Sequence, residues 1–249
     1  MTELSAFAEV QAALERGDHA DVLRRTEAIL ADRPGDDAAH ELRARALLAL
    51  GRVREAEIEA ENAVRLDPDE IRYRELLADV LASEGAHRDA ADEYRRLAAG
   101  HPRQTEWTVA EARERLGAAQ PGMGVDAAQR ALRLDPQNAA AGLALAQGLT
   151  RLGQAGPAYQ AARRAVAMQP ENAAAQETLA DALWLAGEVA AALNGYRDLA
   201  SRFSGQARAG AVRKARTLVR QRSGWFGRLL ASVPWIFEIA LRNGWLSVA

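Results

Sequence analysis

The chain has 249 residues, of which 49% are hydrophobic and 27% are charged, and its formal net charge is −2. This composition predicts a folded protein and excludes an extensively disordered one. The absence of cysteine excludes disulfides, thiolate metal sites and cysteine nucleophiles. The charge is unevenly distributed, because residues 1–70 carry a net charge of −8 and residues 206–249 a net charge of +7.

The N-terminal residues MTELSAFAEV include acids and lack a basic segment followed by an apolar run. They do not have the pattern of a secretory signal. Near the C-terminus, the longest uncharged apolar run lies between Arg228 and Glu238. It is much shorter than the roughly 20 residues that a membrane-spanning helix needs. We therefore expect a cytoplasmic protein.

Glycine and proline recur along the chain at a step of 34 residues. The glycines are Gly17, Gly51, Gly85, Gly153 and Gly187, and the prolines are Pro34, Pro68, Pro102, Pro136 and Pro170. Ala119 and Ser204 occupy the two slots where the series is interrupted. Glycine ends a helix by adopting the left-handed conformation, and proline cannot continue the helical hydrogen bonds. Each period therefore predicts one helical hairpin.

Small residues follow the same step. The first helices carry Ala44, Ala78, Ala112, Ala146 and Ala180, and the second helices carry Ala56, Ala90, Ala158 and Ala192. Small side chains are needed where two helices cross closely. The pattern predicts close helix packing within and between the hairpins.

The period, the small residues and the closing Asp-Pro pairs resemble those of the tetratricopeptide repeat family over about residues 3–204. The resemblance implies an all-α fold, a right-handed α-solenoid superhelix of about six helical hairpins with the first helices lining a concave groove. We predict that residues 1–205 form this solenoid. Residues 206–222 are predicted to form a basic capping helix, and residues 223–249 an aromatic amphipathic C-terminal extension.

The fourth repeat departs from the pattern. Glu111 and Arg115 stand in slots that hold leucine in the third repeat, and glycine and proline are concentrated in residues 117–124. The second helix is therefore predicted only for residues 125–134. We interpret the repeat as a loosely packed one with a long turn. The alternative is a hinge or a binding loop in the middle of the stack.

The resemblance also implies which residues line the groove. We predict that a partner segment contacts four apolar and four basic residues: Leu14, Leu48, Leu116, Trp184, Arg45, Arg72, Arg113 and Arg151. Arginine binds carboxylates through two parallel hydrogen bonds. The alternative is that these arginines pair with acids of neighbouring repeats, such as Glu41, Glu75 and Asp79. Some family members hold a C-terminal carboxylate with lysine and asparagine, which are missing here, so this activity is not transferred.

No catalytic or metal-binding motif stands out in the sequence. It lacks an HExxH pair and a GxxxxGK[ST] phosphate loop. The carboxylates fall on solvated helix faces with arginine partners four residues away. We therefore expect a non-catalytic protein without cofactor or metal.

The C-terminal extension is rich in aromatic and aliphatic residues. The predicted docking residues are Trp225, Phe226, Leu229, Leu230, Trp235, Ile236, Phe237, Ile239 and Trp245. We expect Trp235, Phe237 and Ile239 to point away from the face that carries Ile236 and Ala240, leaving an exposed apolar patch. Removing residues 223–249 should then abolish association and leave the repeats folded.

These patterns favour a non-catalytic protein-binding scaffold or adaptor. Its groove would take a peptide segment or a helix of a partner protein, and its extension would dock to a partner complex or to a second copy of the chain. The alternative is a peripheral membrane protein, because a basic segment with Trp and Phe has the composition of an interfacial helix. Nucleic acid is not favoured as a partner, since the rest of the surface is acidic and repels phosphate.

Overall fold

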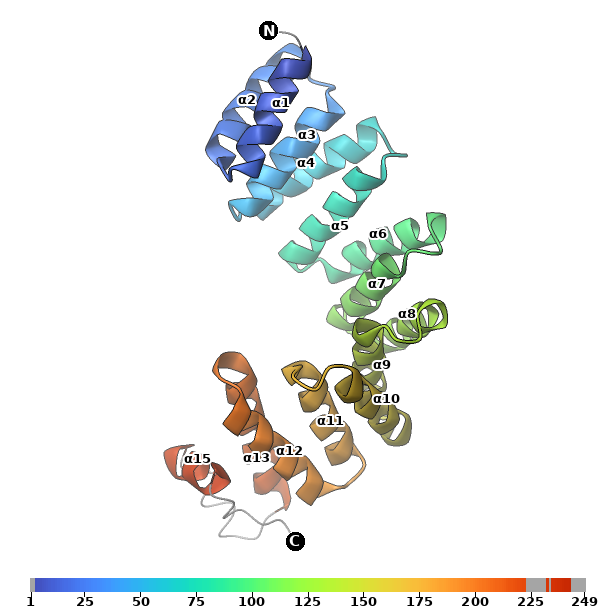
Figure 1. The fold of residues 1–249 in the computed structure, drawn as a ribbon, viewed down its shortest axis with the longest axis vertical. Helices are drawn as coiled ribbons and strands as arrows, with labels where there is room; N and C mark the ends of the chain where they lie inside the picture. The colour runs from blue at the N-terminus through green and yellow to red at the C-terminus, as the bar shows by residue number, and fades with distance from the viewer. Residues whose placement is uncertain (1–2, 223–231, 233, 243–249) are drawn as a thin grey trace. The chain divides into compact units, whose positions relative to one another are not determined.

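The computed structural model describes residues 3–222, 232 and 234–242, and these residues form helices joined by short turns (Figure 1). In chain order the described helices are α1 (Glu3–Glu15), α2 (His19–Asp32), α3 (Asp37–Ala49), α4 (Val53–Leu66), α5 (Ile71–Glu84), α6 (His87–Gly100), α7 (Thr105–Gly117), α8 (Pro121–Leu134), α9 (Ala139–Arg151), α10 (Ala155–Met168), α11 (Ala173–Leu185), α12 (Val189–Arg202), α13 (Gly205–Arg222) and α15 (Pro234–Arg242). None of them is both long and apolar enough to cross a bilayer.

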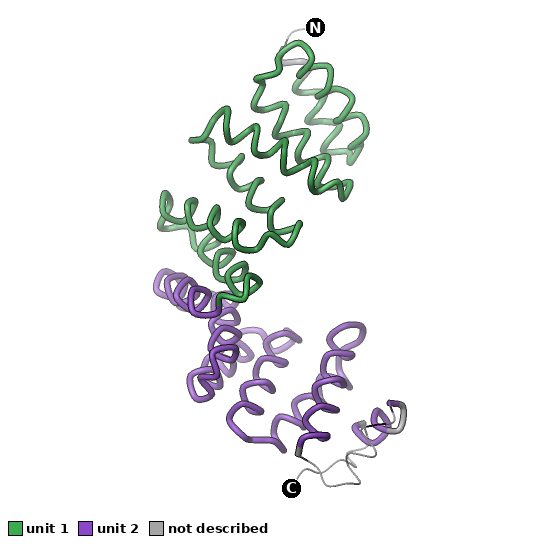
Figure 2. Tube along the Cα trace, turned by 180° about the vertical axis from the view of Figure 1, so that it is seen from behind, with its two compact units in different colours: residues 1–120 green, residues 121–249 purple. Residues whose placement is uncertain are grey.

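The helices pack as consecutive hairpins. Helix α3 packs against α4, α5 against α6, α9 against α10 and α11 against α12, and each second helix also contacts the first helix of the next hairpin. The predicted all-α solenoid is therefore confirmed. The chain divides into two compact units, residues 1–120 and residues 121–249, and the division falls at the end of the turn between α7 and α8 (Figure 2).

The turns inside the hairpins are set by one left-handed residue each. The five periodic glycines have φ between 73° and 87°. At Gly85, its N–H donates to Ala82 O at 3.2 Å, and the next N–H donates to Leu81 O at 2.9 Å. Ala119, in the slot where glycine is missing, makes the same turn with φ 56°. The 34-residue step therefore reflects a backbone requirement, which alanine meets at a cost.

The core lies where helices cross at the small residues. The five periodic alanines of the first helices are at most 1% exposed, and the four of the second helices are fully buried. Gly124 is buried in the corresponding slot of the fourth repeat. Larger side chains from both sides of each hairpin, such as Leu76, Tyr94 and Leu97, complete the core around the alanines in the first unit.

The interpretation of the fourth repeat as a loose hairpin with a long turn is wrong. Helix α8 already begins at Pro121, which suits the first turn of a helix because proline needs no N–H partner there. The clustered glycines Gly122 and Gly124 lie inside α8, so no long loop exists. Arg115 is only 2% exposed, and it donates to Asp92 Oδ1 at 2.5 Å and to Gln120 Oε1 at 3.0 Å. A buried polar cluster replaces the expected leucines.

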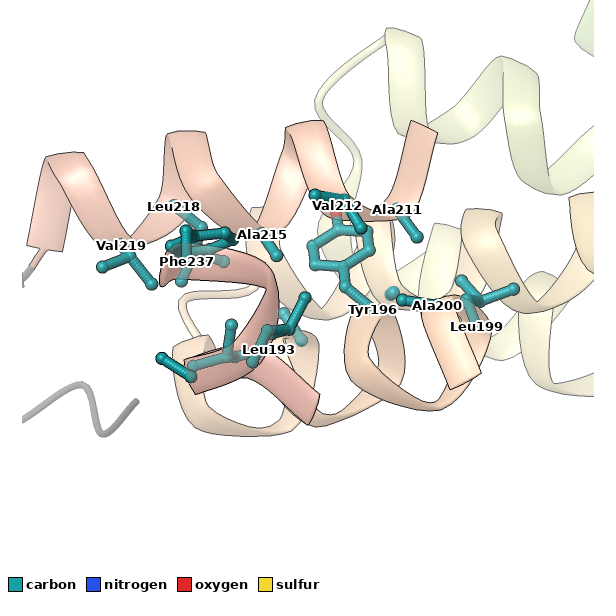
Figure 3. Close-up of a cluster of buried hydrophobic side chains, with 14 residues drawn as sticks. Leu193, Tyr196, Leu199, Ala200, Ala211, Val212, Ala215, Leu218, Val219 and Phe237 are labelled. Atoms are coloured by element: carbon teal, nitrogen blue, oxygen red, sulfur yellow. The ribbon is translucent and has the colours of Figure 1, made fainter. Parts of the chain in front are cut away.

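Helices α13 and α15 close the second unit. They share a hydrophobic core with α11 and α12, in which Phe237 lies beside Ala215 and Leu218 of α13 (Figure 3). Arg208 of α13 also donates to Glu238 Oε2 of α15 at 2.9 Å. The described part of the extension is thus attached to the repeats by both apolar and ionic contacts.

The prediction that Phe237 points away from the packed face of the extension is wrong. Phe237, Ala240 and Leu241 are at most 1% exposed, because spacings of three and four residues place them on one side of α15. Ile239 is 43% exposed, as expected. For Trp235 and Ile236 only the backbone, within α15, is described. The other predicted docking residues lie outside the described residues: Trp225, Phe226, Leu229, Leu230 and Trp245.

Replacing Ala119 with glycine should stabilise the protein by about 1 kcal/mol, because the left-handed conformation strains alanine by more than glycine costs in the unfolded chain. Ala118→Gly is the matched control, since Ala118 has an ordinary φ of −71°. The midpoint of urea unfolding should be higher for Ala119→Gly than for the wild type. It should not be raised for Ala118→Gly. Equal shifts for both variants would contradict the strained turn.

Replacing Phe237 with alanine should lower the free energy of unfolding of the second unit by up to about 3–5 kcal/mol, because the ring is fully buried. It should also speed amide exchange in residues 234–242. Ile239→Ala is the matched control on the exposed side of the same helix and should change the free energy by no more than about 0.5 kcal/mol. The deletion of residues 223–249 should therefore destabilise the repeats, contrary to the expectation from sequence.

Candidate functional site

The predicted groove arginines of the first unit are already engaged within their own repeats. Each of these three is paired with an acid close by in the chain: Arg45 with Glu41, Arg72 with Glu70 at 3.2 Å, and Arg113 with Glu114 at 2.9 Å. Of the acids named in the alternative, Glu41 is the partner of Arg45, but the two lie on one helix and not in neighbouring repeats. Arg72 and Arg113 are paired with acids that the alternative did not name. A partner carboxylate would have to compete with these contacts.

The predicted apolar groove residues differ in exposure. Leu116 is 4% exposed and belongs to the interior, so its prediction as a groove residue is wrong. Leu14 and Leu48 are half-buried against the cores of the first unit. Trp184 is half-buried in the second unit, and its ring meets the edge of Tyr196 at a centroid distance of 6.5 Å.

The second unit has a pocket on the face formed by its first helices. Helices α9, α11 and α13 lie next to one another there and enclose about 250 Å³. The polar side chains that line the pocket are Gln147, Thr150, Arg151, Glu177, Thr178, Asp181 and Lys214. Gln147 and Asp181 occupy the same repeat slot, and Arg151 was predicted from sequence as a groove residue. The periodicity therefore brings residues of two repeats to one site.

An ion-pair network holds one side of this pocket. Lys214 Nζ donates to Asp181 Oδ2 at 2.5 Å and lies 2.8 Å from Glu177 Oε1. The hydroxyl of Tyr196 donates to the other oxygen of Asp181 at 2.6 Å. Since both of its oxygens are engaged, Asp181 has a fixed orientation in the pocket. The equivalent pair Tyr94–Asp79 occurs three repeats earlier.

The network shifts two pKa values. Burial by itself lowers the pKa of Lys214, but hydrogen bonds to Asp181 and Glu177 outweigh it and hold the pKa above its usual value. Burial and then the charge of Asp181 raise the pKa of the Tyr196 hydroxyl. At neutral pH the lysine is therefore charged and the tyrosine is a hydrogen-bond donor. The pocket offers cations and carboxylates side by side.

Lys214 and Glu177 were not predicted as site residues. Lys214 lies on α13, which the sequence placed as a cap beyond the last repeat. The available signal was composition, because Lys214 is the only lysine in a chain with 31 arginines. Within the described residues, no group of three His, Cys, Asp or Glu side chains is arranged to hold a metal ion.

Comparison with known families agrees with this architecture. Residues 13–80 match the model of the tetratricopeptide repeat family. These residues therefore form tetratricopeptide repeats. No functionally curated protein matches its sequence significantly.

Solved structures share the fold of the chain at low sequence identity. A tetratricopeptide repeat protein from Parabacteroides merdae is 14% identical, with a TM-score of 0.70 over 94% of this chain and 97% of that one. PilW, a type IV pilus biogenesis factor, is 16% identical, with a TM-score of 0.67 over 85% of this chain and 100% of that one. The APC/C hetero-tetramer Cut9–Hcn1 gives 13% identity and a TM-score of 0.63, over 94% of this chain and 45% of that one.

Replacing Lys214 with methionine should lower the free energy of unfolding of the second unit by about 1–3 kcal/mol, because Asp181 and Glu177 lose a charged donor. The folded pKa of Lys214 is raised above the ordinary 10.5, so its contribution is complete below pH 10.5 and is lost as the pH rises through the folded pKa. The difference in the free energy of unfolding between wild type and variant should therefore shrink as the pH rises through the folded pKa. Arg220→Met, at an exposed position of α13, is the matched control and should change little. A difference that stays constant from pH 8 to above pH 11 would contradict the charged network.

Proposed function

We propose that this protein is a non-catalytic scaffold that binds a segment of a partner protein on the first-helix face of its second unit. The observation that carries the proposal is the pocket between α9, α11 and α13. Asp181 is held there by two donors before any partner arrives, so little conformational freedom is lost on binding.

The charges of the pocket indicate what the partner segment must provide. Arg151 is exposed at the pocket, and its guanidinium can donate two parallel hydrogen bonds to a carboxylate. Glu177 and Asp181 share a single ammonium group, and both are partly accessible. A segment that carries an acid and a base a few residues apart fits this arrangement. Trp184, one turn further along α11, adds a half-buried aromatic surface.

The fold supports binding over catalysis. Stacked repeats present several helices side by side, so one surface combines residues from different repeats. A structural neighbour of the chain was solved as a hetero-tetramer, in which a protein of this fold assembles with another chain. We extend this mode of action to the present protein.

We further propose that the C-terminal extension makes a second contact with a partner protein. The exposed side chain of Ile239 on α15 is the described feature that supports it. A membrane surface remains the competing occupant. Ile239→Asp tests both, because it should weaken partner capture and leave binding to vesicles of phosphatidylglycerol at the level of the wild type. Loss of vesicle binding alone would favour the membrane alternative.

The pocket is tested by affinity capture from the cells of origin, with the full chain as bait. Arg151→Glu should lower the yield of the captured partner by tenfold or more, which is about 1.4 kcal/mol of binding free energy. Arg133→Glu makes the same charge change at an exposed position of α8 away from the pocket and should leave the yield unchanged. The proposal fails if both variants capture the same proteins in the same amounts as the wild type.

A further inference from the structure

A second cavity of the second unit lies between α8 and α10, over α9, and has a volume of about 550 Å³. None of its lining residues belongs to the first-helix pocket described above. It therefore requires an explanation that does not depend on partner binding in that pocket. The repeat structure provides one, because each side chain can be compared with its equivalents 34 residues away.

In the second and third repeats the equivalent space is filled by a charged pair. His40 Nδ1 lies 2.5 Å from Glu59 Oε2, and Arg74 Nη1 lies 2.8 Å from Glu93 Oε2. His40 and Arg74 each also reach the carbonyl oxygen of the proline in the preceding loop, at 3.1 Å. The pair joins the first and second helices of its repeat and closes the space between them.

The fifth repeat lacks both members of the pair. Gly142 stands in the slot of His40 and Arg74, and Ala161 stands in the slot of their acidic partners. Leu145 and Leu149 occupy slots that hold leucine in the third and sixth repeats as well, and they contribute apolar lining to the cavity. Both glycine and alanine are buried here, so the missing side chains leave space inside the fold. The cavity lies where Gly142 and Ala161 lack the side chains that form the charged pair of the second and third repeats.

The walls and the rim of the cavity differ in polarity. Leu132, Leu145, Leu149 and Met168 form the apolar part of the lining. The rim carries exposed glutamines and the guanidinium of Arg164, which is the only charged group among the described lining residues. An apolar interior with a single cation at its mouth matches a ligand with a hydrocarbon body and one negative charge.

We propose that this cavity binds a small amphipathic carboxylate, with its aliphatic chain among the leucines and its carboxylate on Arg164. The volume lies within the range of roughly 300–1,000 Å³ that is usual for small-molecule sites. A guanidinium binds a carboxylate through two parallel hydrogen bonds. Met168 adjusts the fit, because its Cε lies 3.0 Å from the point where a Cβ on Gly142 would be, and a methionine side chain adapts easily.

Dodecanoate, kept below its critical micelle concentration, tests the site by isothermal titration calorimetry with the full chain. One equivalent should bind saturably. Gly142→Gln introduces the side chain that the sixth repeat has in this slot. It should weaken the binding of dodecanoate tenfold or more, because it fills the cavity. Met168 is the flexible neighbour that has to move, and glutamine is a better helix former than glycine, so the variant should remain folded.

Gly156→Gln is the matched control. It makes the same substitution in the same hairpin, at an exposed helical position with open space around it and outside the cavity lining. Its affinity for dodecanoate should equal that of the wild type. Circular dichroism of both variants shows whether the fold is retained.

Arg164→Gln tests the carboxylate contact separately. It should weaken the binding of dodecanoate several-fold. It should leave unchanged the affinity for dodecanol, which has the same chain without the charge. The proposal is overturned if dodecanoate does not bind saturably, or if Gly142→Gln binds it as well as the wild type does. It is also overturned if Arg164→Gln changes the affinities for dodecanoate and dodecanol by the same factor. None of these readouts depends on partner capture, so they stand apart from the scaffold function.

Discussion

The close crossing of helices at periodic alanines is the contact on which the rest of the structure depends. Two helices of 13 or 14 residues cannot bury their apolar faces alone, so each hairpin is stable only against its neighbours. Close approach requires a side chain no larger than a methyl group at the crossing point. Ala44, Ala78 and Ala146 are fully buried at these points. The second to sixth hairpins all have alanine in this slot, so they share the same crossing point with their neighbours.

This constraint leaves other slots free to vary, and the functional differences lie there. The slot of Arg74 holds a charged side chain in the third repeat and glycine in the fifth, where a cavity results. The slot of Asp181 faces the first-helix pocket, where Lys214 from the following helix completes a charged site. A repeat stack thus keeps its packing constant and changes its chemistry one slot at a time.

The regular part of the fold was predictable from sequence because it rests on local requirements. The left-handed glycines and the loop prolines located the hairpins, and the buried alanines located the crossings. The fourth repeat was mispredicted because Arg115 is buried and donates to Asp92, a contact across the hairpin boundary that no local pattern reveals. Phe237 was placed on the wrong side of its helix, since its partners on α13 are known only after folding. Lys214 was missed for the same reason.

The central claim is that close helix crossing at the alanine slot holds the stack together, and a pair of variants on α3 tests it. Ala44 is fully buried at a crossing and Ala49 is exposed at the end of the same helix. The free energy of unfolding in urea should fall by about 1–3 kcal/mol for Ala44→Leu, because the larger side chain forces the helices apart. It should stay within about 0.5 kcal/mol of the wild type for Ala49→Leu. Equal stability of the two variants would contradict the account.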